Sequence, residues 1–256
     1  MMARIACIHA HPDDAEILLG GTLTLLARKG HAVTVVTMTP GDCGTKEHPP
    51  EVISRIRRAE GAAGAEAMGA RYTCAEFRDM AVFIDDESRR RVTALVRDLR
   101  PDLVITASPS DYHCDHEGTS HLVRDACFAA GCPNYDCSAF SQAPALEAIP
   151  HLYFADPVEG MDREGRLIRP DFVVDIASTF TVKRDALACH ASQRQWLSDH
   201  HGMDNYLDEM ERWTRGRGKL AGLEYGEGFR HYKIHPYPQA PLLEDLLGSQ
   251  MVTRFL

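Results

Sequence analysis

Short apolar runs alternate with longer helical segments through the first half of the chain, and this alternation constrains the fold more than any other feature. Residues 3–8 and 32–38 are apolar or β-branched runs of strand length. Helical patterning covers residues 14–29 and 51–68, and a glycine stands directly after each segment as a stop. The pattern continues with a strand at 71–77, a helix at 86–100, a strand at 102–107 and a helix at 117–130. Strands that alternate with helices predict an α/β fold with a mostly parallel sheet and helices on both faces.

The second half of the chain is less regular than the first. Residues 131–150 are rich in Pro, Ala, Ser and Cys and are typical of a loop. The expected elements that follow are strands at 151–154 and 171–176, a helix at 178–191 and a helical excursion at 194–222. No break in composition divides the chain, so we expect residues 1–256 to form a single-domain, Rossmann-like three-layer sandwich with an irregular C-terminal part from about 131 to 256.

Composition and charge exclude several classes of protein. The net charge of −9 argues against a nucleic-acid partner, which requires clustered lysine and arginine. No apolar stretch approaches the length of a membrane span, and no secretion signal opens the chain. Eight scattered cysteines without a Cys-x-x-Cys pair predict a reduced, cytoplasmic protein. The first strand is not followed by Gly-x-Gly-x-x-Gly, so dinucleotide binding is not supported.

Acidic and histidine side chains cluster at two turns that follow predicted strands. The first strand leads into His11-Pro12-Asp13-Asp14-Ala15-Glu16, and the fourth is followed by Asp111-Tyr112-His113-Cys114-Asp115-His116. In an open α/β sheet, ligands bind at the carboxyl ends of the strands. Two adjacent carboxylates beside a histidine are more than a metal needs, so one can bind the metal while the other takes a proton from water. The clusters together predict a mononuclear metal site with its own base, although Asp13 and Glu16 also have the spacing of a helix capping box.

The first cluster resembles the N-terminal signature of the LmbE/PIG-L family of zinc-dependent N-acetylglucosamine deacetylases, which includes enzymes of the bacillithiol and mycothiol pathways. The end of the second cluster resembles that family's His-x-Asp-His signature. Weaker matches extend the resemblance over about residues 3–230, and the two signatures are specific as a pair. Relatives that act on mycothiol precursors carry a tyrosine two residues before the first histidine of this signature. This chain has Asp111 there, so the substrate stays open.

The resemblance implies a ligand set and a catalytic base. His11, Asp14 and His116 supply the three ligands of a catalytic zinc site, and other divalent first-row metals also suit this set. Asp13 is then the base that takes a proton from the attacking water. His113 is free to act as an acid or as a donor to the oxyanion.

The resemblance also implies which residues orient His113 and which contact the substrate. His113 needs an orienting carboxylate, which Asp115 or Asp111 can provide, and Asp115 is therefore counted with Asp13 and His113 among the expected catalytic residues. Arg57 is the family's candidate for gripping an anionic or polyhydroxylated part of the substrate, and the alternative is an ion pair with Glu60 on the surface of a helix. Asp79 falls where the family has a sugar-contacting aspartate.

The function that this resemblance implies is metal-assisted hydrolysis of an amide. We expect removal of the acetyl group from an N-acetylglucosamine-type amino sugar or conjugate, with metal and His113 stabilising the tetrahedral oxyanion. The alternatives are an amidase that acts on a thiol-sugar conjugate or a non-sugar acyl amine, and a metal-binding module without catalysis. A binding module has no use for a base beside a three-ligand site.

The C-terminal segment 194–222 carries an apolar stripe, in which Tyr206, Met210 and Trp213 recur at helical spacing. The stripe packs either on its own domain or against a neighbouring subunit. Homo-oligomers built through C-terminal elements are common among members of the resembled family, so we expect a homo-oligomer. In an oligomer this segment also walls the mouth of the pocket.

Overall fold

The computed structural model describes residues 2–201 and 205–255, and its centre is one eight-stranded sheet in the order β3-β2-β1-β4-β5-β7-β6-β8. The strands are β1 (Arg4–His9), β2 (Ala32–Thr37), β3 (Arg71–Cys74), β4 (Leu103–Thr106), β5 (His151–Ala155), β6 (Phe172–Asp175), β7 (Gly226–His231) and β8 (Val252–Arg254). Strands β3, β2, β1, β4 and β5 are parallel, whereas β7, β6 and β8 join by antiparallel pairing.

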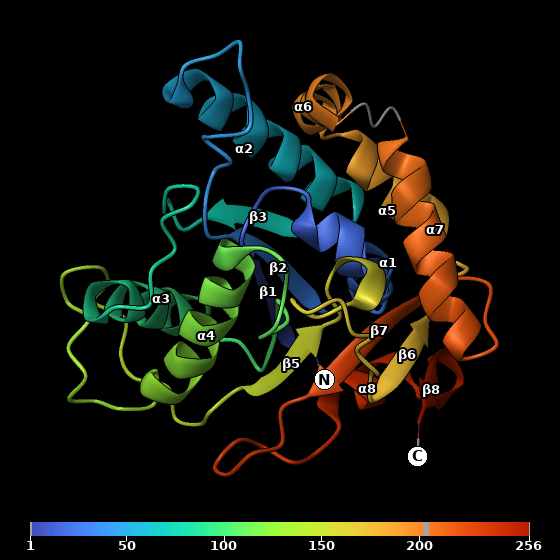
Figure 1. Cartoon of the computed structure of the whole chain (residues 1–256). Helices are drawn as coiled ribbons and strands as arrows, with labels where there is room; N and C mark the ends of the chain where they lie inside the picture. The colour runs from blue at the N-terminus through green and yellow to red at the C-terminus, as the bar shows by residue number, and fades with distance from the viewer. Residues whose placement is uncertain (1, 202–204, 256) are drawn as a thin grey trace.

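Helices cover both faces of this sheet, as the alternation of strands and helices predicts (Figure 1). The helices are α1 (Asp14–Arg28), α2 (Pro50–Ala67), α3 (Asp86–Leu99), α4 (Cys114–Ala129), α5 (Phe180–Ala188), α6 (Ala191–His201), α7 (Tyr206–Leu220) and α8 (Leu242–Leu247), with short 3₁₀ turns at η1 (Val158–Gly160) and η2 (Ser249–Met251). None of them, within the described residues, combines the length and the apolar character that crossing a membrane requires.

The pleat of the central strands divides their side chains between two cores. In β1, Ile5 and Cys7 pack with α1, α5 and α7, whereas Ala6 and Ile8 pack with α3 and α4. Both sets are buried because both faces of a parallel sheet are covered, which explains why the strands are continuous apolar runs instead of alternating ones. The α/β class and the mostly parallel sheet are therefore confirmed.

Several predicted boundaries need correction. Strand β3 ends at Cys74 instead of residue 77, because the chain turns at Glu76, whose φ is 58°. Helix α4 begins at Cys114 instead of 117, because His113 caps it. Strands β7 and β8 were not predicted, and β7 contains Gly226 and Gly228 among polar residues, a composition that lacks the signal of a strand.

Candidate active site

The two clusters meet because β1 and β4 are neighbouring parallel strands. Ile5 pairs with Leu103 and Ile8 with Thr106, so both strands end at the same edge of the sheet. The loop after β1 leads into α1, and the loop after β4 leads into α4, as Figure 1 shows. This arrangement places the clusters at the carboxyl end of the strands, where open α/β sheets bind ligands.

Three side chains converge where these loops meet. His11 Nδ1 lies 3.3 Å from His116 Nε2 and 3.6 Å from Asp14 Oδ2, and His116 Nε2 lies 3.4 Å from Asp14 Oδ1. Ligand atoms held at about 2.0–2.1 Å around a tetrahedral zinc ion are about 3.3 Å from one another. The spacing of this donor group, His11, Asp14 and His116, therefore fits one zinc ion with a fourth position left open.

The charges around the donor group also favour a cation. Burial lowers the pKa of His11, but hydrogen bonds with Asp115 and Asp14 outweigh it and raise that pKa to about 9. Burial also lowers the pKa of His116, but the carboxylates of Asp14 and Asp111 outweigh it and raise that pKa well above its usual value. Two histidines that face carboxylates in this way favour a positive charge between them, whether it is a proton or a metal ion.

Each histidine of the donor group is oriented by a carboxylate on its other ring nitrogen. His116 Nδ1 lies 2.9 Å from Asp111 Oδ1, and His11 Nε2 lies 3.2 Å from Asp115 Oδ2. Such pairs fix the tautomer and leave the remaining nitrogen to bind a metal. Asp111 Oδ1 also accepts a hydrogen bond from the backbone N–H of His113 at 3.1 Å, so Asp111 positions the backbone of His113. That Asp115 or Asp111 orients the ring of His113 remains a prediction.

His113 is also held by the start of a helix. Its Nδ1 accepts a hydrogen bond from the backbone N–H of Asp115 at 3.2 Å, which makes it the N-cap of α4. Burial and the neighbouring His11 and His116 lower the pKa of His113, which favours its neutral form. Because Nδ1 accepts, the neutral ring carries its hydrogen on Nε2. A ring nitrogen of His113 lies within 4.8 Å of those of His11 and His116, so His113 offers an N–H donor beside the donor group.

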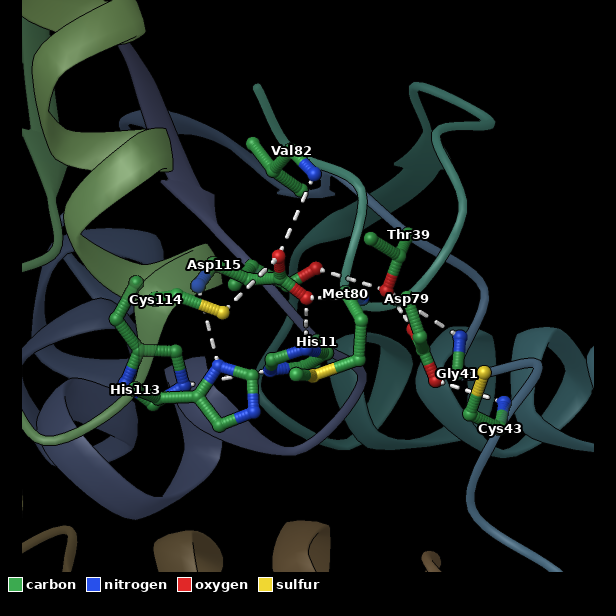
Figure 2. Close-up of polar contacts among 12 residues, drawn as sticks. His11, Thr39, Gly41, Cys43, Asp79, Met80, Val82, His113, Cys114 and Asp115 are labelled. Carbon is green, nitrogen blue, oxygen red and sulfur yellow. Dashed lines mark hydrogen bonds and ion pairs between the residues drawn. The ribbon is translucent and has the colours of Figure 1, made fainter. Parts of the chain in front are cut away.

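Asp115 also binds the backbone of the loop that follows β3. Its carboxylate accepts hydrogen bonds from the backbone N–H of Met80 at 2.7 Å and of Val82 at 3.3 Å (Figure 2). The same carboxylate contacts His11, so the loop that follows β3 and the ring of His11 are positioned together. Asp115 is therefore placed to position other groups, and its predicted catalytic role remains a prediction.

Asp13 lies beside the donor group without belonging to it. It occupies the N-cap position of α1, but its φ is 100° and its side chain makes no capping hydrogen bond, so the capping-box interpretation is wrong. Its Oδ2 accepts a hydrogen bond from the hydroxyl of Tyr206, and its Oδ1 lies 3.7 Å from Arg57 Nη2. Burial raises the pKa of Asp13 above its usual value, although Arg57 and His190 oppose this effect. A raised pKa suits a carboxylate that must take a proton near neutral pH.

Arg57 is buried under the loop that follows β2. Its Nη2 donates to the carbonyl of Pro12 at 3.1 Å, and its guanidinium is packed so closely that a Cβ at Gly41 or Gly44 would lie 2.5 Å or 2.8 Å from Nη1. The alternative ion pair with Glu60 is wrong, because the carboxylate of Glu60 accepts hydrogen bonds from Ser192. The role of Arg57 on substrate remains a prediction, since its observed partners are within the protein.

Asp79 holds the loop after β2 in place. Its carboxylate accepts hydrogen bonds from the hydroxyl of Thr39 and from the N–H of Cys43 at 2.9 Å (Figure 2). The N–H of Asp79 donates to the carboxylate of Asp42 at 2.8 Å. Asp79 lines the same pocket as the donor group. Sugar contact by Asp79 remains a prediction, and the hydrogen bonds show that both of its oxygens already serve the loop.

The pocket over the donor group has a volume of about 470 Å³, and α6 and α7 form much of its wall. Of the predicted apolar stripe, Tyr206 and Met210 are buried in the chain's own core, and Trp213 lines the pocket. The stripe therefore packs on its own domain, and it offers no support for an interface. A homo-oligomer remains a prediction.

The contact of Tyr206 with Asp13 was not predicted. Helical spacing shows which face of a helix is apolar, and it does not show which residue the tyrosine hydroxyl contacts.

Comparisons with known proteins find similar sequences and structures over most of the chain. The family model for GlcNAc-PI de-N-acetylase, PIG-L, matches residues 6–127. Diacetylchitobiose deacetylase from Thermococcus kodakarensis is 28% identical over 237 residues, 89% of this chain and 82% of the relative. The 4-oxalmesaconate hydratase of Pseudomonas putida is 27% identical over 231 residues, 87% of this chain and 86% of the relative. Among solved structures, N,N'-diacetylchitobiose deacetylase from Pyrococcus horikoshii aligns with a TM-score of 0.77 and 25% identity, over 94% of this chain and 89% of that one.

Proposed function

Because the chain belongs to the PIG-L/LmbE family, we propose that it is a metal-dependent N-deacetylase that removes the acetyl group from an N-acetylglucosamine-type amino sugar or conjugate. One observation carries the proposal: the carboxylate of Asp13 lies beside the donor group, outside it, and is held by Tyr206 and Arg57. A site that only stores a metal has no need of a fixed base next to its ligands.

The residues of the chain divide the reaction between them. A zinc ion, or another divalent first-row metal, held by His11, Asp14 and His116 supplies a Lewis acid at this point. Asp13 accepts a proton from the water that attacks the acetyl carbon. His113 directs its Nε2 hydrogen at the oxygen on which negative charge develops. When the carbon–nitrogen bond breaks, the amine takes up a proton from Asp13 or His113, and the products are acetate and the free amino sugar.

Other reactions are also compatible with these residues. An amidase that acts on a thiol-sugar conjugate or on a non-sugar acyl amine would use the same site, with different residues around the mouth of the pocket. A hydratase also needs an activated water, and one relative carries that name, so similarity alone does not decide the reaction. Hydration releases no acetate, which separates it from deacetylation in a single assay.

The deciding experiment follows acetate and free amine with the zinc-loaded protein on a panel of N-acetylated sugars, conjugates and acyl amines. We expect equimolar acetate and amine from at least one N-acetyl sugar, and loss of both after chelation and their return with zinc. Acetate release that is indifferent to chelation would contradict a metal-dependent reaction. Complete absence of acetate from the panel would contradict the deacetylase proposal.

A further inference from the structure

Met80 has a backbone conformation that a methionine does not favour. It lies in the loop between β3 and α3, and its φ is 63°. Residues with a long side chain rarely adopt this left-handed region, because their Cβ comes too close to a backbone carbonyl oxygen. Such strain persists only where the surrounding structure imposes it, and it is concentrated at active sites. The conformation of Met80 therefore calls for an explanation in terms of function.

The contact that imposes this conformation belongs to the active site. The N–H of Met80 donates to Asp115 Oδ2 at 2.7 Å, and His11 Nε2 lies 3.2 Å from the same oxygen. One carboxylate oxygen thus joins the backbone of Met80 to a ring of the donor group. The position of Met80 is therefore fixed relative to the donor group.

The side chain of Met80 gains little from the rest of the protein. Met80 is 58% exposed, and among the described residues it belongs to neither of the two apolar cores. It lines the pocket over the donor group, and in the view of Figure 2 it extends from its loop toward the rings of His11 and His113. A ligand in the pocket would cover this thioether and remove it from water. Met80 therefore offers an apolar surface to a ligand directly beside the donor group.

This surface suits one end of an N-acylated substrate. In the proposed reaction the acyl carbon lies between Asp13, which takes the proton from water, and His113, which faces the oxygen. The amine carries the larger part of the substrate, and the pocket of about 470 Å³ along α6 and α7 has room for it. The acyl chain is small and apolar, and the side of the pocket that Met80 lines provides the matching surface.

We propose that Met80 is a specificity-determining residue that limits the length of the acyl group. Its side chain closes the pocket beside the acyl methyl, so that an acetyl group fits and a longer chain collides with the thioether. One methylene in an apolar pocket changes discrimination by about 10-fold to 200-fold. The protein should therefore prefer N-acetyl to N-butyryl substrates by at least about tenfold. This inference rests on the proposed deacetylation and adds the selection of the acyl group to it.

Met80→Gly is a sharp test, because glycine adopts a φ of 63° without strain and keeps the N–H that binds Asp115. The substrates are the N-acetyl, N-propionyl and N-butyryl derivatives of glucosamine, and the released carboxylic acid is measured with zinc-loaded protein. Met80→Gly should raise the ratio of kcat/KM for N-butyryl over N-acetyl by about tenfold. Met80→Leu keeps a side chain of similar volume and should keep the preference for acetyl. Circular dichroism and metal content verify that each variant is folded and loaded.

Met161→Gly is the matched control. Met161 is 40% exposed and lines a different hollow, so loss of its side chain should leave the ratio unchanged.

A binding measurement tests the same contact without turnover. Both tryptophans of the chain, Trp196 and Trp213, line the pocket, so their fluorescence reports binding. In zinc-loaded Asp13→Asn protein, N-butyrylglucosamine should bind about tenfold more weakly than N-acetylglucosamine. In the double variant with Met80→Gly, the two sugars should bind nearly equally.

The outcomes separate this inference from the proposed function. If Met80→Gly leaves the butyryl-to-acetyl ratio unchanged, or changes all three substrates by the same factor, Met80 does not select the acyl group. Acid release with an unchanged ratio would leave the deacetylase intact and reject the role of Met80. A shift in the binding ratio without release of any carboxylic acid would support the role of Met80 and reject deacetylation. Absence of both binding and acid release for every probe would overturn both proposals.

Discussion

The hydrogen bond from Tyr206 to Asp13 gives a sharp test of how the base is positioned. Tyr206 is the first residue of α7, and its hydroxyl donates to Asp13 Oδ2 from the far part of the sequence. Tyr206→Phe removes only that hydroxyl and keeps the ring that packs in the core. The carboxylate then loses its hydrogen-bond donor on Oδ2 and is held only by the 3.7 Å contact of Oδ1 with Arg57, so it can rotate away from the attacking water more easily.

The expected size of the effect follows from this contact. A hydrogen bond to a charged group contributes about 1.5–3 kcal/mol, so unfolding should become easier by about that amount or less. The rate of the chemical step should decrease by a larger factor, because misplacing a reacting group by about 1 Å lowers the rate on the order of 10²-fold. We expect kcat to fall about ten- to hundredfold while KM changes little, since the hydroxyl serves Asp13.

Tyr237→Phe is a matched control for this experiment. Tyr237 is 7% exposed, close to the 6% of Tyr206, and its hydroxyl donates to the carbonyl of Arg124. Urea unfolding should show a loss of stability in both variants, and acetate release should show the loss of kcat in Tyr206→Phe alone. Equal kcat values in the two variants, or a change in KM alone, would refute the assignment of Tyr206 as the residue that positions the base.

Three further predictions follow from the geometry. Alanine at His11, Asp14 or His116 should lower metal content by elemental analysis, and full occupancy in all three variants would contradict the donor group. Asp13→Asn should retain the metal and lose about 10²–10⁴ in acetate release, whereas loss of the metal would make Asp13 a ligand. Burial lowers the pKa of His231 from 6.5 to about 4, so the folded protein resists protonation of this ring. The free energy of unfolding should therefore fall, by at most about 3 kcal/mol, as the pH drops from 6.5 to 4. His231→Phe should flatten that decline in urea unfolding, and an unchanged pH slope would reject the explanation.

The first half of the fold could be predicted because its local signals agree with its tertiary structure. Strands β1, β2 and β4 are buried on both faces over most of their length, so most of their residues are apolar or β-branched. Gly30 and Gly69 have φ values of 83° and 77°, a conformation that suits glycine, and each directly follows the C-cap of its helix. The antiparallel strands at the other edge could not be predicted, because their pairing is non-local and β7 carries glycines and charges.

The donor group was predictable for a different reason. His11 and Asp14 lie in one short motif, and His116 lies in another, at the ends of strands that the topology makes adjacent. The orienting carboxylates were not predictable in the same way. Asp111 lies in the loop before α4 and Asp115 in the first turn of that helix, and the sequence does not show that Asp111 contacts His116 and Asp115 contacts His11.

The pocket is built from two parts of the chain, the turns after β1 and β4 and the C-terminal helices, and this division has a consequence for binding. The donor group and His113 are fixed by backbone turns at the ends of β1 and β4, so changes there alter the chemistry itself. Trp196 and Trp213 line the same pocket from α6 and α7. Substitutions at Trp196 or Trp213 are therefore expected to alter binding in the pocket while the donor group keeps its positions on the turns after β1 and β4. Tyr206 is the exception, because it belongs to α7 and its hydroxyl donates to Asp13. A change at Tyr206 therefore affects both the pocket lining and the position of the expected base.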